Sequence, residues 1–113
     1  MTEKILSQIK QDVLAVSDIY AERFQVERDR SWYLAKLTEE LGELTAADLK
    51  CSGNARSSGK SEQDLEEDLA NEAADLFAHI LLFCSDRSID LEKALKRKWL
   101  KYLPADPDGQ INK

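Results

Sequence analysis

Lys36–Lys50, KLTEELGELTAADLK, and Glu67–Cys84, EDLANEAADLFAHILLFC, are the two stretches that decide the fold. In both, apolar residues recur every three or four positions, which is the period of an amphipathic helix. We therefore expect two helices packed side by side and joined by a polar loop. Their expected apolar stripes are Leu34, Leu37, Leu41 and Leu44 in the first helix, and Leu65, Leu69, Ala73, Leu76 and Ile80 in the second.

The flanking sequence predicts two further helices. A broad apolar face over Thr2–Phe24 is typical of a packing helix, and its members are Ile5, Ile9, Val13, Val16, Ile19 and Tyr20. Three serines are placed to cap the next three helices, which should run to about Lys50, Ser85 and Leu103; these serines are Ser31, Ser61 and Ser88. The prediction is one all-α domain over residues 1–103, a four-helix bundle completed by oligomerisation, with a C-terminal tail over 104–113.

The amino-acid composition and charge exclude some classes of function. With 113 residues the chain can bury a modest core, and only 4 Gly and 2 Pro interrupt it. The net charge of −6 argues against general nucleic-acid binding, which depends on Lys and Arg. No apolar run approaches the roughly 20 residues that span a bilayer, and we see no leader. We expect a cytoplasmic protein with free thiols at Cys51 and Cys84.

Acidic residues follow the edges of both predicted stripes. Glu40 and Glu43 lie along the first, and Asp68, Glu72, Asp75 and His79 along the second. Carboxylates one helical turn apart repel, and only Lys36 offers a nearby positive charge. Mg²⁺ or Mn²⁺ would neutralise such a cluster, because hard cations prefer oxygen ligands. A merely charged helical surface remains the alternative on spacing alone.

The two stretches resemble the paired motif of MazG-like nucleoside triphosphate pyrophosphohydrolases. That motif is EExxE followed by ExxD, matched by Glu39-Glu40-Leu-Gly-Glu43 and Glu72-Ala-Ala-Asp75. The resemblance implies a homodimer or homotetramer that cleaves the α–β bond of (deoxy)nucleoside triphosphates, giving monophosphate and pyrophosphate in nucleotide-pool housekeeping. Carried over by position, it implies Mg²⁺ ligands at Glu40, Glu43, Glu72 and Asp75. It also implies an outer carboxylate, Glu39, that orients or deprotonates water.

Four further residues are substrate-contact candidates. Lys98 projects into the stripe of the last helix and could bind phosphate, although KWLKYLP departs from the family's pattern after that lysine. Trp32 could stack on a base, or simply pack. His79 could contact phosphate or a ligand carboxylate, or be a hydrogen-bonded core residue. Asp48 could bind the sugar or base, or form a salt bridge to another helix.

Two other functions stay open. EAADLFAHILL is similar to phosphoribosyl-ATP pyrophosphohydrolase, including the histidine four residues after the aspartate. KLTEELGEL and KRKWLKYLP look more like the MazG group. A non-catalytic helical interaction protein is the alternative from another class, and the complete acidic motifs favour the enzyme over it.

Overall fold

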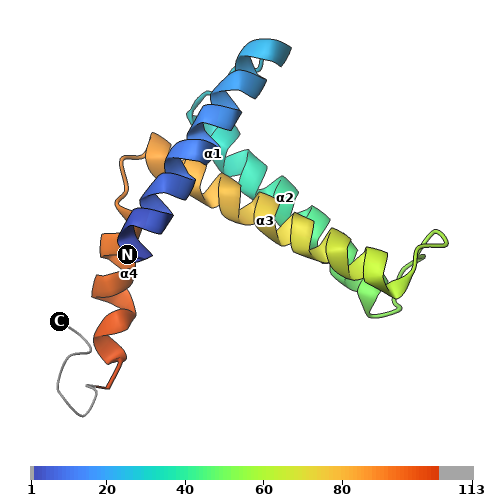
Figure 1. Cartoon of the computed structure of the whole chain (residues 1–113). Helices are drawn as coiled ribbons and strands as arrows, with labels where there is room; N and C mark the ends of the chain where they lie inside the picture. The colour runs from blue at the N-terminus through green and yellow to red at the C-terminus, as the bar shows by residue number, and fades with distance from the viewer. Residues whose placement is uncertain (1, 105–113) are drawn as a thin grey trace.

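The computed structural model describes residues 2–104, with side chains from Ile5 onward, and this part of the chain is all-helical. Figure 1 shows four α-helices: α1 (Thr2–Phe24), α2 (Arg30–Cys51), α3 (Glu62–Asp86) and α4 (Leu91–Lys98). A short 3₁₀ helix, η1 (Leu100–Tyr102), follows α4. No strand occurs among these residues, so the all-α prediction is confirmed. Of the predicted tail, residues 105–113 lie outside the described part of the chain.

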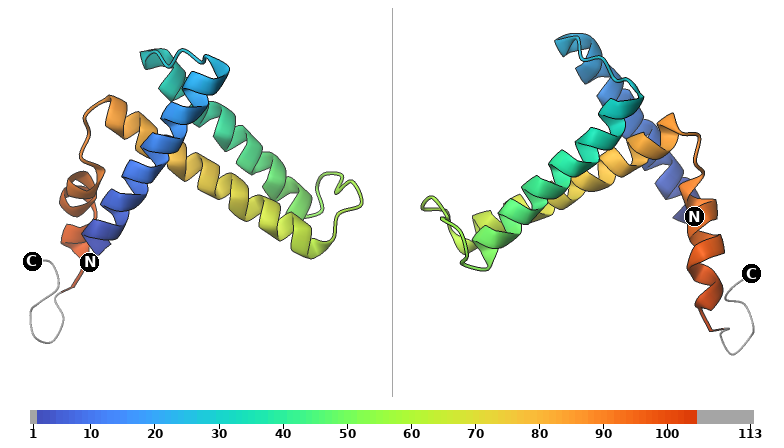
Figure 2. Two further views of the ribbon diagram at one scale, coloured as in Figure 1. Left: turned by 45° about the horizontal axis from the view of Figure 1, so that its top comes forward. Right: turned by 180° about the vertical axis from the view of Figure 1, so that it is seen from behind.

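Helices α2 and α3 form the scaffold of the molecule. They lie side by side over most of their length, and α1 crosses α3 near the C-terminal end of α3 (Figures 1 and 2). Two contacts attach the end of α2 and the polar loop that follows it to α3. The Sγ atom of Cys51 donates to the Leu65 carbonyl at 3.3 Å, and Lys60 forms a 2.6 Å ion pair with Asp68.

Side-chain caps set the N-termini of α2 and α3. Ser61 caps α3 as predicted, accepting a hydrogen bond from the Asp64 backbone N–H at 3.1 Å. The prediction that Ser31 caps α2 is wrong. Asp29 holds that position, and its carboxylate accepts from the Trp32 N–H at 2.8 Å. A residue further upstream satisfies the exposed N–H groups of the first turn, so α2 begins at Arg30.

The C-terminal segment differs from the single helix predicted over Ile89–Leu103. Ser88 adopts a left-handed conformation with φ 55° and helps to end α3, so the prediction that it caps α4 is wrong. Asp90 is the cap, accepting from the Lys93 N–H at 3.0 Å. The α-helix then gives way to η1, and Leu103 is extended because proline disfavours helical backbone in the residue before it.

The buried face of α2 is rotated from the predicted stripe. Glu40 and Ala47 are the buried residues of this helix, whereas Leu34 and Leu41 are each 53% exposed. In α1 the predicted face is largely exposed as well, with Ile5 at 60%. The α1 residues that line cavities lie opposite three buried side chains of α3, Leu81, Leu82 and Cys84. The fourth buried residue of α3, Leu65, lies beside Ala47 of α2.

One chain does not close a four-helix bundle. Its radius of gyration is 17.7 Å, whereas a compact domain of about 100 residues has a value of about 13 Å. The bundle's predicted completion by oligomerisation therefore stays a prediction. None of the described helices combines the length and the hydrophobicity needed to cross a membrane.

Candidate active site

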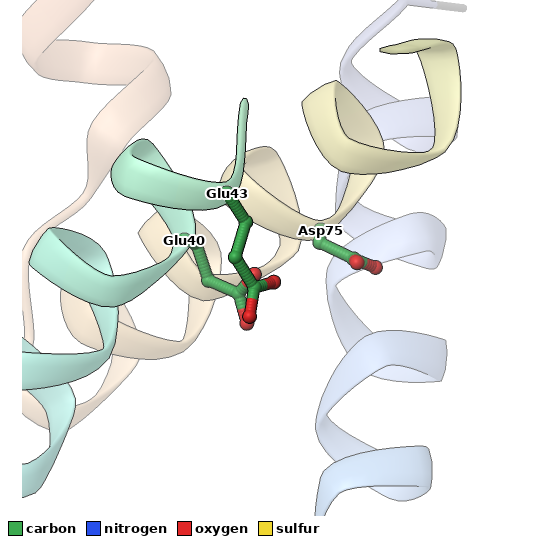
Figure 3. A group of neighbouring side chains, drawn as sticks. All are labelled: Glu40, Glu43 and Asp75. Atoms are coloured by element: carbon green, nitrogen blue, oxygen red, sulfur yellow. The ribbon is translucent and has the colours of Figure 1, made fainter. Parts of the chain in front are cut away.

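Three carboxylates converge where α2 and α3 pack together. One oxygen from each of Glu40, Glu43 and Asp75 lies within 4.8 Å of the others. Figure 3 shows the carboxyl groups of Glu40 and Glu43 side by side, with Asp75 extending from the neighbouring helix. Glu72 is one turn before Asp75 on α3, outside this group of three. Burial and then the charges of Glu43 and Asp75 raise the pKa of Glu72, which places it beside the cluster.

Glu40 is the unusual member of the cluster. Its side chain is only 9% exposed, and its Oε2 atom is buried without a hydrogen-bond partner. Burial raises the pKa of Glu40 to about 7; Glu43 and Asp75 add to the increase, and Lys36 opposes it. A buried carboxylate oxygen without a hydrogen-bond partner is costly, so a native structure needs a reason to keep it.

A divalent cation bound here would supply that reason. Mg²⁺ prefers oxygen ligands at about 2.1 Å in octahedral geometry, which places neighbouring ligand oxygens roughly 3 to 4 Å apart. The three carboxylates are already nearly that close, and the unpartnered Oε2 of Glu40 provides a free ligand atom. The residues present therefore fit the metal that the sequence predicted.

Lys36 and Glu39 form a charged pair beside the cluster. The Lys36 Nζ atom lies 2.5 Å from Oε1 of Glu39 and 3.8 Å from Oε1 of Glu40. The hydrogen bond from Lys36, followed by its charge, lowers the pKa of Glu39. The Glu39 side chain is 56% exposed and lies at the edge of the site; its role as an outer carboxylate stays a prediction.

A cavity of about 530 Å³ adjoins the carboxylates between α1 and the α2–α3 pair. Its walls combine apolar and aromatic side chains with a few polar groups, as is typical of a small-molecule site. Trp32 lies in the wall with its ring centroid 5.9 Å from that of His79. The lining includes Val13, Val16, Tyr20 and Trp32, together with Lys36, Glu40, Asp75 and His79.

His79 reaches this cavity in its neutral form. Burial, and then the charge of Lys36, lowers its pKa, although Asp75 and Glu39 oppose the decrease. Its Nδ1 atom is buried and has no hydrogen-bond partner. Both substrate-contact candidates that the sequence placed near the carboxylates, Trp32 and His79, are therefore brought to the same cavity.

A second cavity, of about 370 Å³, continues along α2 and α3 toward the loop. Three acidic side chains, Glu43, Asp68 and Glu72, line it, and Ala47 and Leu65 contribute apolar surface. Lys50 is the single basic residue of this lining. The acidic surface thus extends well beyond the three converging carboxylates.

Two predicted contact residues lie elsewhere in the single chain. Asp48 follows Glu43 by five residues, which places it about 140° around α2 on an exposed face. Lys98 is on α4, and no residue of α4 lines either cavity beside the carboxylates. Conversely, the α1 residues of the larger cavity, Ser17 and Tyr20 among them, were not predicted as site residues.

Comparison with known proteins places the chain in a family. No curated protein and no solved structure matches it. The family model described as phosphoribosyl-ATP pyrophosphohydrolase matches residues 3–97, which include every predicted metal ligand. This finding supports the phosphoribosyl-ATP alternative better than the resemblance to MazG itself. The chain therefore belongs to the phosphoribosyl-ATP pyrophosphohydrolase family, hydrolases of phosphoanhydride bonds within the MazG-like all-α superfamily.

Proposed function

We propose that this chain is a Mg²⁺-dependent pyrophosphohydrolase that cleaves the α–β phosphoanhydride bond of phosphoribosyl-ATP. The products are pyrophosphate and phosphoribosyl-AMP. The family match supports this substrate. The observation that carries the reaction is the convergence of three carboxylates around Glu40, whose buried Oε2 atom has no partner.

The metal ligands in this proposal are Glu40, Glu43 and Asp75, with Glu72 beside them. Bound Mg²⁺, or Mn²⁺ in its place, would hold the substrate phosphates and lower the pKa of the attacking water. Glu40 must release its proton to serve as a ligand. The neutral form that burial favours in the free protein thus gives way to the charged form when the cation binds.

Glu39 is the proposed base. Its pairing with Lys36 keeps it ionised and restricts its position at the edge of the cluster. In hydrolysis, water adds across the α–β link. The water oxygen bonds to phosphorus, the bridging oxygen leaves with one of the two products, and the water proton passes to the carboxylate.

The larger cavity is the proposed site for the purine. Trp32 offers an aromatic face, and Val13, Val16 and Tyr20 make the opposite wall apolar. The cavity includes Glu40 and Asp75 in its lining, so a base bound there has its phosphates near the carboxylates. His79, whose pKa is lowered by burial, also lines this cavity and would offer a ring nitrogen to the same ligand.

Ordinary ribo- and deoxynucleoside triphosphates are the second candidate substrates, in nucleotide-pool housekeeping. KLTEELGEL and KRKWLKYLP, which resemble the MazG group, favour this candidate. The pocket for the base would be the same. The reaction and the metal ligands would also be unchanged, so only substrate choice separates the two.

The test is a substrate panel with Mg²⁺: phosphoribosyl-ATP and the common ribo- and deoxynucleoside triphosphates, with monophosphate and pyrophosphate measured. We expect turnover of phosphoribosyl-ATP. Glu43→Gln or Asp75→Asn should lower kcat/KM at least about a hundredfold, as expected for loss of a metal ligand. Glu66→Gln, an exposed acid on the same helix as Asp75, is the matched control and should have little effect.

The outcomes separate the candidates. Turnover of ordinary triphosphates without phosphoribosyl-ATP would establish the second candidate. No turnover of any substrate would contradict the enzyme and favour a helical interaction protein, whereas full activity in both ligand variants would contradict the proposed metal site.

We also propose that the protein is cytoplasmic and assembles as a homodimer or homotetramer. The apolar face of α1 supports assembly, because it includes Ile5 at 60% exposure and Ile19 at 57%. Apolar patches of this kind on a small chain mark interaction surfaces. Sedimentation of the purified protein measures the state directly.

A further inference from the structure

One hydroxyl group lies among the apolar side chains on the α1 side of the larger cavity. Ser17 lines this cavity together with Val16 and Trp32. It is half-buried, whereas Asp12, the other polar α1 residue of the lining, is exposed. The remaining polar groups of the lining belong to α2 and α3, which carry the carboxylate cluster. Ser17 is therefore the partly buried polar group that meets a ligand from α1.

Arg28 holds the Ser17 hydroxyl in place. The Nη1 atom of Arg28 lies 2.9 Å from Oγ of Ser17, and its Nη2 atom lies 2.8 Å from Oδ1 of Asp18. The Arg28 side chain is only 22% exposed and does not itself line the cavity. Because the guanidinium is planar, its two bonds to neighbouring residues of α1 restrict its orientation.

The direction of the bond to Ser17 decides what this hydroxyl can do. An arginine side chain has only donors, so Oγ of Ser17 accepts and its own proton is not used in this bond. A hydroxyl inside a helix often donates to the carbonyl one turn earlier, as Thr45 does to Leu41 at 2.8 Å. Within the described part of the chain, Ser17 makes no such bond. Its proton is therefore available to a ligand that offers an acceptor.

The connection between α1 and α2, residues 25–29, fixes the position of Arg28 (Figure 1). Gln25 adopts a left-handed conformation with φ 52°, and the Val26 N–H donates to the Ala21 carbonyl at 2.9 Å, which ends α1. Asp29, the next residue after Arg28, caps α2. Arg28 thus lies between two defined helix ends, and its guanidinium ties α1 to the start of α2.

A ring nitrogen of a purine is an acceptor that suits this position. In the proposed function the base stacks on Trp32 and its phosphates lie at the carboxylates, so the base meets the α1 wall that includes Ser17. The adenine atoms N3 and N7 accept hydrogen bonds. Phosphoribosyl-ATP shares both atoms with ordinary adenine nucleotides, so either substrate offers them.

We propose that Ser17 donates its hydroxyl proton to N3 or N7 of a purine bound in the larger cavity, and that Arg28 is the positioning residue that keeps Ser17 a donor. A purine without that nitrogen would leave the hydroxyl unpaired and should bind less tightly. The inference rests on the proposed function for the place of the base, and its test therefore measures binding separately from turnover.

The first test compares the two hydrogen-bond partners of Arg28. Calorimetry measures the binding of AMP with Mg²⁺, because AMP has no α–β link to cleave. Ser17→Ala should weaken binding about three- to tenfold, as expected for loss of one neutral hydrogen bond. Asp18→Asn is the matched control, since it changes the other partner outside the cavity; binding should change less than about twofold. No binding of AMP, or equal losses in the two variants, would overturn the proposal.

The second test removes the acceptor from the ligand. In 3-deaza-AMP and 7-deaza-AMP, a C–H group replaces N3 or N7. Wild type should bind one of these analogues about three- to tenfold more weakly than AMP, whereas Ser17→Ala should bind that analogue and AMP equally. A merely structural role of Ser17 would weaken both ligands alike and leave their ratio unchanged. An unchanged ratio, or a lost preference for AMP over 2′-deoxy-AMP alone, would overturn the proposal.

Combined variants test the role of Arg28. Arg28→Met keeps most of the side-chain length but removes the donors, so it should weaken AMP binding about as much as Ser17→Ala. In the Ser17→Ala background the same change should cost less than about a further twofold, because the two residues act as one unit. Arg28→Lys keeps a donor and should recover part of the discrimination between AMP and the analogue. Losses that multiply in the double variant would overturn the positioning role.

The readouts distinguish this inference from the proposed function. A wild type that turns over no substrate, yet binds AMP with the expected dependence on Ser17, would contradict the pyrophosphohydrolase and support the base contact. A wild type that cleaves phosphoribosyl-ATP, with an unchanged KM and unchanged discrimination in Ser17→Ala, would overturn the base contact alone.

Discussion

The Nε2 atom of His79 lies 3.7 Å from Oε1 of Glu40, just beyond hydrogen-bond distance, and each residue keeps one buried atom without a partner. These atoms are Nδ1 of His79 and Oε2 of Glu40. The carboxylate of Glu40 and the ring of His79 could form a hydrogen bond but do not, so their arrangement serves another purpose than pairing with each other. Glu40 belongs to a cluster suited to a cation, and both side chains line the cavity suited to a nucleotide.

The raised pKa of Glu40 predicts how stability depends on pH without metal. In the folded protein its pKa is about 7, against 4.5 for an ordinary glutamate, so the folded state holds a proton that the unfolded chain releases between these values. Stability should therefore fall as pH rises from 4.5 to 7, by up to about 3 kcal/mol. Thermal unfolding in EDTA across this range measures the effect.

Glu40→Gln and added Mg²⁺ provide the checks on this prediction. The neutral amide removes the titration, so the variant should be more stable than wild type at pH 8 in EDTA. Mg²⁺ stabilises the charged carboxylate and should raise the melting temperature of wild type more at pH 8 than at pH 5. An unchanged pH dependence in Glu40→Gln would show that another group is responsible.

Removal of Lys36 should move the pH dependence of catalysis. Its ammonium lowers the pKa of Glu39 and opposes the increase at Glu40. In Lys36→Gln both carboxylates should hold their protons to higher pH, so the acidic limb of the kcat/KM profile should shift upward. Lys50→Gln, on the same helix beside the smaller cavity, should leave the limb in place. Equal shifts would indicate a general charge effect.

Trp32 should contribute to substrate binding through stacking. Its ring lines the larger cavity next to His79, and loss of one base–aromatic stack costs about 1 to 3 kcal/mol. Trp32→Ala should therefore raise KM roughly fivefold or more with a smaller effect on kcat. Trp32→Phe keeps an aromatic face and should retain most of the affinity. A fall in kcat alone would mean that Trp32 positions the carboxylates instead.

Local sequence patterns predicted the bounds of the first three helices well. The bounds of α1 agree with prediction, and Ser61 caps α3 because its hydroxyl reaches the Asp64 N–H. The clustering of Glu40, Glu43 and Asp75 also followed from helical spacing, once two helices were assumed to pack side by side. These features depend on contacts between residues close in sequence or on one shared interface.

Features that depend on the choice of packing partner could not be predicted. Periodicity identifies an apolar stripe but not what covers it, and Leu41 is exposed because α3 packs against the Glu40 side of α2. For the same reason, the sequence did not predict that α1 forms a wall of the larger cavity. Tyr20 carries no signal that separates an active-site wall from a core position. The position of Tyr20 in the cavity wall follows only from the way α1 crosses the other helices.

The cap of α2 provides a test of local structure that is independent of function. Asp29 accepts from the Trp32 N–H at 2.8 Å, whereas Ser31 lies inside the helix. Asp29→Ala should destabilise the protein by about 1 kcal/mol, the usual cost of losing an N-cap. Ser31→Ala should be nearly neutral or slightly stabilising, because alanine is the better helix former. Urea unfolding of the two variants compares them directly. A larger loss of stability in Ser31→Ala than in Asp29→Ala would show that Ser31 caps α2, as the sequence pattern predicted.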